Sequence, residues 1–216
     1  MFRILSSITI LFILAGLAAC TSDDKARDEA TTAINEEIAA LNAPLSPSIG
    51  KVAITSNEKL VLDNNKEIEL PEIGDTSVVT LFIIRGAESM EGKTSLSEPG
   101  LNRSGYLASL MGRVNLAQVY SEGNSALQTG MFSAQANQAE VNLFKGEQAK
   151  DFVSMVVGNF KGKRVLIIGM PKTVPALLNV LAGKIVEGKM PEEEYEHFYI
   201  VKVKKIGDVE IVHASY

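Results

Sequence analysis

Three charged side chains, two of which are cations that could bind an anion, follow two apolar stretches of the sequence. Arg85 and Glu88 come after the apolar run at residues 78–84, and Lys172 comes after the run at residues 164–168. An arginine and a lysine that lie close together can hold an anion through their charges. The alternative is that Arg85 pairs with Glu88 or another carboxylate, since a buried cation needs a counter-ion.

The segment at residues 86–94 is close to a phosphate-binding P-loop, but its spacing is wrong. It reads Gly-Ala-Glu-Ser-Met-Glu-Gly-Lys-Thr, with one residue too many between the glycines of the pattern G-x-x-x-x-G-K-T. The backbone N–H groups of such a loop must converge on the phosphates, and two glutamates inside it would repel them. We therefore reject a nucleotide-binding role for this segment.

The elements that position these loops alternate between strand and helix. Strands are predicted over 78–84, 117–121, 164–168, 198–203 and 209–213, and helices over 99–111, 125–137, 147–160 and 173–181. Such alternation predicts an α/β fold with three αβα layers and a mostly parallel central sheet. In these folds binding sites form at the carboxyl ends of the strands, where the loops after residues 84 and 168 are expected.

Between residue 77 and the end, Arg-Gly-Ala-Glu at 85–88, Leu-Ser-Glu-Pro-Gly at 96–100 and Val-Tyr-Ser at 119–121 follow one another in order. Together with later segments they resemble the histidine phosphatase superfamily, the phosphoglycerate-mutase-like enzymes. The segment 80–88, Thr-Leu-Phe-Ile-Ile-Arg-Gly-Ala-Glu, is similar to a family strand that ends in Arg-His-Gly or Arg-His-Ala-Glu. Further similar segments are Leu-Ser-Glu-Pro-Gly-Leu-Asn-Arg at 96–103, Val-Tyr-Ser at 119–121, Val-Leu-Ile-Ile-Gly-Met-Pro-Lys-Thr-Val-Pro-Ala-Leu-Leu at 165–178, and the late strand within 194–201.

The resemblance implies a phosphate pocket in which one histidine attacks phosphorus, while a second histidine and two arginines hold the phosphoryl oxygens. Here the nucleophile position is Gly86, the second histidine position is Met170, and Ala126 is nearest to the place of the second arginine. Only the first arginine remains, so we expect no intact catalytic residue and no phosphohistidine chemistry. The expected vestigial pocket consists of Arg85, Gly86, Glu88, Met170 and Lys172.

The remaining acid–base candidates have no evident partner in the sequence. Glu88 and Ser121 stand next to no recognisable base or nucleophile. His197 and His213, the only histidines, are interpreted as isolated surface or packing residues, and their spacing does not indicate a metal site. We therefore expect no metal and no cofactor.

The N-terminus has the layout of a secretory signal peptide, with Arg3 followed by an apolar core at residues 8–19. That core is shorter than the roughly 20 residues of a membrane span. The residues 17–20, Leu-Ala-Ala-Cys, resemble the lipobox, which implies cleavage after residue 19 and diacylglycerol and palmitate on Cys20. The alternative is an ordinary cleaved signal with an incidental cysteine. Thr21, in place of an aspartate, points to the outer membrane, facing the periplasm.

The predicted organisation is a signal peptide at 1–19, a lipidated tether at 20–50, a β-hairpin extension at 51–76 and a histidine-phosphatase-like domain at 77–216. Part of the tether could instead be a thin amphipathic helix that docks on a partner. The net charge is −5 and there is no basic cluster, which excludes nucleic acid as a partner. Expected partners are membrane lipid through Cys20 and an envelope protein or a small anion.

We therefore expect a membrane-anchored, catalytically inactive lipoprotein with this fold, acting as a binding or structural module of the cell envelope. The alternative is an active phosphatase or other hydrolase with a non-standard site.

Overall fold

The computed structural model describes residues 24–216 and divides into two compact units. The described part of the first unit is the helix α2 (Asp24–Asn42), and the second unit is Ala43–Tyr216. The predicted signal peptide at 1–19 and the lipidation site Cys20 lie outside the described residues. No helix within 24–216 has both the length and the apolar character that a membrane crossing requires.

The helix α2 occupies most of the segment predicted as a tether. It ends at Asn42, directly before an Ala43-Pro44 step, because a residue that precedes proline is disfavoured in helical conformation. Residues 43–50 form neither helix nor strand and belong to the second unit. We call this segment the strap.

The second unit is built on a six-stranded sheet in the order β6-β5-β7-β4-β8-β9. The strands are β4 (Val79–Arg85), β5 (Gln118–Ser121), β6 (Val141–Leu143), β7 (Arg164–Gly169), β8 (His197–Lys205) and β9 (Asp208–Ser215). The first four of these run parallel to one another, and β8 and β9 are antiparallel additions beside β4. The predicted mostly parallel α/β sheet is confirmed, with β6 as a short edge strand that the sequence did not reveal.

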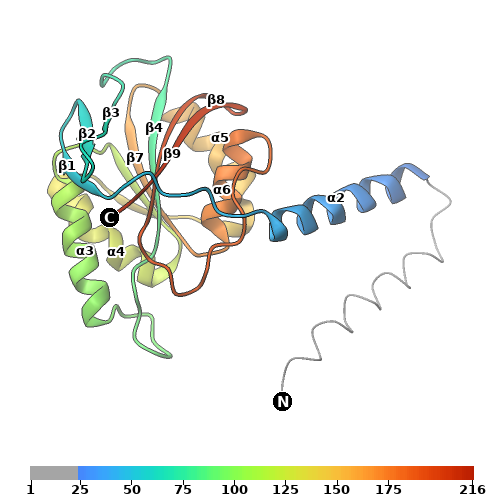
Figure 1. Cartoon of the computed structure of the whole chain (residues 1–216), viewed down its shortest axis with the longest axis horizontal. Helices are drawn as coiled ribbons and strands as arrows, with labels where there is room; N and C mark the ends of the chain where they lie inside the picture. The colour runs from blue at the N-terminus through green and yellow to red at the C-terminus, as the bar shows by residue number, and fades with distance from the viewer. Residues whose placement is uncertain (1–23) are drawn as a thin grey trace. The chain divides into compact units, whose positions relative to one another are not determined.

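Helices cover both faces of this sheet (Figure 1). They are α3 (Glu98–Met111), α4 (Gly123–Asn137), α5 (Ala149–Asn159) with a 3-10 turn before it (Gly146–Gln148), and α6 (Thr173–Ala182). Alternate residues of β4 enter two separate cores. Phe82 and Ile84 pack with residues of α3 and α4, whereas Leu81 and Ile83 pack with residues of α5 and α6. The three predicted layers therefore follow from the uninterrupted apolar run of β4.

The segment predicted as a β-hairpin forms a three-stranded antiparallel sheet of β1 (Val52–Thr55), β2 (Lys59–Leu62) and β3 (Glu67–Glu69). Residues 63–66 join β2 to β3, and residues 56–58 join β1 to β2, a second connection that a hairpin does not have. The apolar residues of this sheet join the core on the α3 and α4 side. Those residues are Val52, Leu60, Leu62, Ile68 and Leu70.

Candidate functional site

The carboxyl ends of β4, β5 and β7 meet at one edge of the sheet. Arg85 pairs with Gly169 in the register of β4 and β7, and the Gly86 amide donates to the Gly169 carbonyl at 2.9 Å. The Glu122 amide, just after β5, donates to the Ile168 carbonyl at 2.9 Å. The two loops predicted to carry the site therefore lie side by side, as expected for adjacent parallel strands.

Gly86 and Ala126 come together at this edge although 40 residues separate them in the sequence. A Cβ atom added to Gly86 would lie 3.5 Å from the Ala126 Cα and 3.6 Å from its Cβ, which is ordinary van der Waals contact. The two positions that the resemblance assigns to a nucleophile and an arginine are thus neighbours. The first has no side chain and the second ends at a methyl group that cannot donate a hydrogen bond.

One nitrogen of the Arg85 guanidinium is bound to the backbone of the loop before β8, whereas its buried Nε has no hydrogen-bond partner within the described residues. Its Nη1 donates to the carbonyl oxygens of Pro191, Glu192 and Glu194, at 3.1, 2.8 and 3.0 Å. The Arg85 Cζ also lies 3.8 Å from the centre of the Tyr195 ring, a cation–π contact. Burial lowers the pKa of Arg85 below its ordinary value, while the charge of Glu192 opposes this shift. Arg85 therefore acts as a clamp on residues 191–195.

Glu88 does not pair with Arg85, contrary to the alternative considered from the sequence. Its carboxylate accepts two hydrogen bonds from Arg103 Nε, at 3.1 and 2.9 Å, and one from Arg103 Nη2 at 2.7 Å. The reason is geometric, because the start of α3 packs against the backbone of Glu88. Ser97, the N-cap of that helix, donates to the Glu88 carbonyl through both its amide and its hydroxyl.

Met170 and Lys172 stand at the start of α6, beside a carboxylate that the sequence did not reveal. The Met170 amide donates to Glu122 Oε2 at 2.8 Å. A carboxylate of the protein itself therefore already binds one of the N–H groups at the start of this helix, where an external anion could otherwise bind. The Met170 side chain is 43% exposed. Lys172 is also exposed, and its ammonium has no ion pair within residues 24–216.

The loop after Gly86 is tied down by α4. The Ala87 amide donates to the Thr129 hydroxyl at 3.0 Å, and Gln128 binds the Leu96 amide and the Thr94 carbonyl. Ser121, a generic nucleophile candidate, is fully buried, and within the described chain its hydroxyl has no hydrogen-bond partner. No base therefore activates it.

His197 and His213 are not isolated, which corrects the prediction. The Nδ1 of His197 lies 2.9 Å from the Nε2 of His213, because β8 and β9 form an antiparallel pair that folds the two residues together. The His213 ring stacks on Tyr199, with ring centres 4.3 Å apart. Residues 24–216 contain no group of three or more His, Cys, Asp or Glu side chains that could hold a metal ion.

The histidine pair continues into Ser46 of the strap and Glu187. His213 Nδ1 contacts the Ser46 carbonyl and lies 3.4 Å from its hydroxyl. That hydroxyl is hydrogen-bonded to the buried Glu187 carboxylate, so a histidine base does not activate it as a nucleophile. Ser46 and Glu187 are 141 residues apart. We found no sequence signal that relates them.

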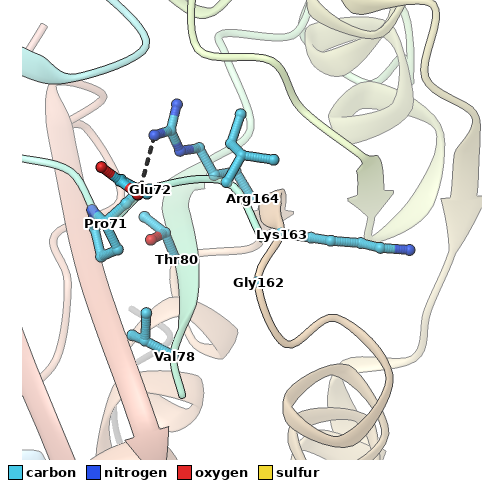
Figure 2. Close-up of a pocket in the computed structure, with 8 residues that line it drawn as sticks. Pro71, Glu72, Val78, Thr80, Gly162, Lys163 and Arg164 are labelled. Carbon is cyan, nitrogen blue, oxygen red and sulfur yellow. Dashed lines mark hydrogen bonds between the residues drawn. The ribbon is translucent and has the colours of Figure 1, made fainter. Parts of the chain in front are cut away.

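A second buried arginine, Arg164, lies at the opposite end of β7 and also donates hydrogen bonds to backbone carbonyl oxygens. It donates to the carbonyl oxygens of Val114, at 2.8 Å, and Asn57. Figure 2 shows its third bond, to the Pro71 carbonyl oxygen at 2.8 Å. The surrounding depression contains no space that a water molecule could occupy. Arg164 thus fastens the small sheet and neighbouring loops to the main sheet, and no binding role follows.

Comparison with known proteins establishes the fold. No family model matches the sequence, and no curated protein matches it either. Among solved structures, the protein histidine phosphatase SixA complexed with tungstate is 16% identical, with a TM-score of 0.50 over 63% of this chain and 96% of that one. Bacillus stearothermophilus YhfR is 13% identical, with a TM-score of 0.51 over 62% and 96% of the two chains. The fold is therefore histidine-phosphatase-like.

Proposed function

We propose that this protein is a membrane-anchored relative of the histidine phosphatases that has lost phosphoryl transfer and serves as a binding or structural module of the bacterial cell envelope. The fold supports the relationship, and the arrangement of the site supports the loss of chemistry.

The observation that carries this proposal is the commitment of Arg85. A guanidinium stabilises a phosphoryl group by directing its N–H donors at the phosphoryl oxygens. Here Nη1 of Arg85 is bound to three carbonyl oxygens of residues 191–194, and its flat face is covered by Tyr195. Redirecting this side chain to an anion would leave those carbonyl oxygens without their donor.

The neighbouring positions support the same conclusion. Gly86 offers no nucleophilic atom, and Ala126 beside it offers no charge. The Glu122 carboxylate at the Met170 amide would repel a phosphate that approached this loop. Since one oxyanion donor is worth about 10²–10³ in rate, the combined loss is consistent with no measurable turnover.

The anchoring part of the proposal rests on residues 1–20, where an apolar stretch ends in Leu-Ala-Ala-Cys and Cys20 is the only cysteine. Two or more acyl chains hold a protein stably on a membrane. We expect the chain expressed in bacteria to incorporate radiolabelled palmitate and to sediment with membranes, and we expect Cys20→Ser to do neither. Equal labelling of both proteins would contradict anchoring through Cys20.

The catalytic part is tested with the full chain purified in detergent, using p-nitrophenyl phosphate as the substrate and Arg85→Ala and Lys172→Ala as the variants. We expect no turnover above buffer for any of the three proteins. Turnover by the parent that is lost in Arg85→Ala but kept in Lys172→Ala would show that the pocket works and that the proposed inactivity is wrong.

A further inference from the structure

Three loops meet at the end of the sheet away from the candidate site. They are the loop between α5 and β7, the loop after α6 and the turn between β8 and β9, which lies at the amino end of β4 because β8 and β4 are antiparallel (Figure 1). In the first loop, Lys161 Nζ donates to the carbonyl oxygens of Val203, at 3.2 Å, and Lys204. In the turn, the Gly207 amide donates to the Leu181 carbonyl at 2.8 Å. Segments that are distant in sequence are therefore neighbours here.

This end of the sheet gathers lysines that are scattered in the sequence. Residues 152–186 contain no aspartate or glutamate, and neither do residues 197–207. The meeting of the three loops brings the lysines of both segments together, although the sequence has no basic cluster. Four of these lysines are exposed, and with Ile185 and Ile206 we call them the lysine face: Lys163, Lys184, Lys204 and Lys205.

The exposed lysines of this face are not needed to hold the fold together. Within residues 24–216 none of the four forms an ion pair. Lys163 Nζ lies 5.9 Å from the centre of the Phe160 ring, and the ammonium groups of the other three make no hydrogen bond to the described residues. Their charges are therefore available to a partner.

Carboxylates near the lysine face are fewer than the lysines. Three exposed ones without an ion pair in the described chain lie in the adjoining segments: Asp208, opposite Lys205 in the register of β8 and β9, and Glu72 and Asp75 in the loop before β4. With the neighbouring Lys161 and Lys189, six lysines stand against these three carboxylates. This end of the molecule is therefore positive, although the whole chain has a net charge of −5.

Two exposed isoleucines lie among these charges. Ile206 in the turn between β8 and β9 is 40% exposed, and Ile185 in the loop after α6 is 37% exposed. A Cβ on Gly183 would lie 3.4 Å from the Gly207 Cα, so the two segments that carry these isoleucines are in contact. Lysines around exposed apolar side chains suit the surface of an anionic bilayer. There the ammonium groups attract lipid phosphates, and apolar side chains enter the boundary of the acyl region.

The chain that leads from the predicted lipid anchor enters the domain beside this face. Ala43 is the first residue of the second unit, and a Cβ on Gly188 would clash with the Ala43 carbonyl oxygen. Gly188 belongs to the same loop as Lys184 and Ile185. Only α2 and a few residues separate Ala43 from Cys20, so lipid on Cys20 would keep the domain close to the bilayer.

We propose that the lysine face docks the anchored domain on a bilayer that contains anionic phospholipid. The four lysines bind lipid phosphates, and the two isoleucines enter the interface. This inference deepens the anchoring part of the proposed function and rests on it for the lipid at Cys20. Since the candidate site lies at the other end of the sheet, docking directs that site away from the membrane, where an envelope partner can reach it.

The test places a dye on the full chain after reconstitution into vesicles through its own anchor. Ile206→Cys is labelled with nitrobenzoxadiazole, whose fluorescence rises and shifts to the blue in an apolar environment. Leu143→Cys, on the edge strand β6 and 59% exposed in the parent, is the matched control. The unsubstituted parent is the blank, because its one cysteine is acylated under the proposed function. The vesicles contain phosphatidylcholine alone or an equal mixture of phosphatidylcholine and phosphatidylglycerol.

We expect the dye at position 206 to brighten at least about twofold with the mixed vesicles and to stay unchanged with phosphatidylcholine, because docking needs anionic lipid. The dye at position 143 should respond to neither. Lys204→Glu should lower the ratio of docked to undocked domain by about fivefold or more, the factor that one lysine contributes near an anionic leaflet. Lys150→Glu, at the other end of α5, should leave this ratio unchanged. Salt at about 1 M should remove the response by screening the charges.

Sedimentation of the vesicles separates failure of docking from failure of anchoring. Protein that sediments with the mixed vesicles but shows no response at position 206 would overturn docking and leave anchoring intact. An equal response with phosphatidylcholine, or an equal response at position 143, would overturn the role of the lysine face. Protein that remains in the supernatant would overturn anchoring and docking together. A response at position 206 to polyglutamate but not to the mixed vesicles would assign the face to an acidic protein and refute the proposal.

Discussion

The backbone of Glu88 passes so close to Gly100 that a Cβ on Gly100 would lie 2.1 Å from the Glu88 carbonyl oxygen. This contact joins the loop after β4 to the first turn of α3, where Ser97 also donates to the same carbonyl. The loop after β4 can therefore take this position only because Gly100, more than ten residues further along the chain on α3, has no side chain.

A matched pair of alanine substitutions tests this contact. Gly100→Ala should lower the free energy of unfolding by about 2–3 kcal/mol, since packed backbone cannot move aside without strain. Gly105→Ala lies on the same helix, and a Cβ there would meet nothing within 4 Å. It should raise stability by about 0.5–1 kcal/mol through helix propensity. Urea unfolding measures both, and equal effects would contradict the close approach.

Arg85 is expected to contribute to stability and not to turnover. Arg85→Ala removes the donor of three carbonyl oxygens in a buried site, which should cost about 3 kcal/mol of unfolding free energy. Arg85→Lys should recover only part of this loss, because an ammonium lacks the planar face that covers Tyr195. The exposed Lys172→Ala serves as the control, with a change below about 0.5 kcal/mol. A neutral Arg85→Ala in denaturant unfolding would refute the clamp.

The Glu88–Arg103 pair should make stability depend on pH in the acid range. Although burial raises the pKa of Glu88, the hydrogen bonds and charge of Arg103 outweigh burial and hold the pKa below its ordinary value of 4.5. The contribution of this ion pair to the free energy of unfolding is therefore complete above pH 4.5 and is lost as the pH falls through the lowered pKa of Glu88. Glu88→Gln should cost about 1–2 kcal/mol near neutral pH. Unfolding curves at about pH 6 and pH 3 measure this cost. The difference in unfolding free energy between Glu88→Gln and the parent should be smaller at pH 3 than at pH 6. An equal difference at both pH values would argue against the Glu88–Arg103 pair.

A histidine introduced at position 86 should fit without giving the protein phosphoryl-transfer activity. The Cβ would make ordinary contacts with Ala126, so Gly86→His should change the free energy of unfolding by less than about 1.5 kcal/mol. It should form no phosphohistidine with an acyl or aryl phosphate donor, because neither Ala126 nor Met170 supplies a donor for the phosphoryl oxygens. Acid-labile phosphate on the variant, measured with a radiolabelled donor, would mean that Arg85 can leave its clamp.

Much of the fold was within reach of the sequence, because its signals are local. The apolar runs at residues 78–84 and 164–168 identify the two central strands, and the predicted helices end within about two residues of the observed ones. The order of motifs indicated the histidine-phosphatase-like fold. The edge strand β6 was missed because its three residues, none of which is buried, carry no periodic signal.

The loops of the candidate site could be located from sequence, but the partners of their side chains could not. Motif positions alone were enough to bring Gly86, Ala126 and Met170 to one edge of the sheet. That Arg85 binds carbonyl oxygens more than 100 residues away, and that Glu88 binds Arg103, depends on how the loop before β8 and the start of α3 pack.

The sequence by itself thus determined which strands form the sheet, which loops meet at its carboxyl edge and which chemical groups are absent there. Only the tertiary structure decided that the two histidines form one hydrogen-bonded pair and that Ser46 of the predicted tether lies against them. The physical reason is that strand and helix patterns come from neighbouring residues, whereas a buried polar group is satisfied by whichever distant backbone or side chain the fold brings within about 3 Å.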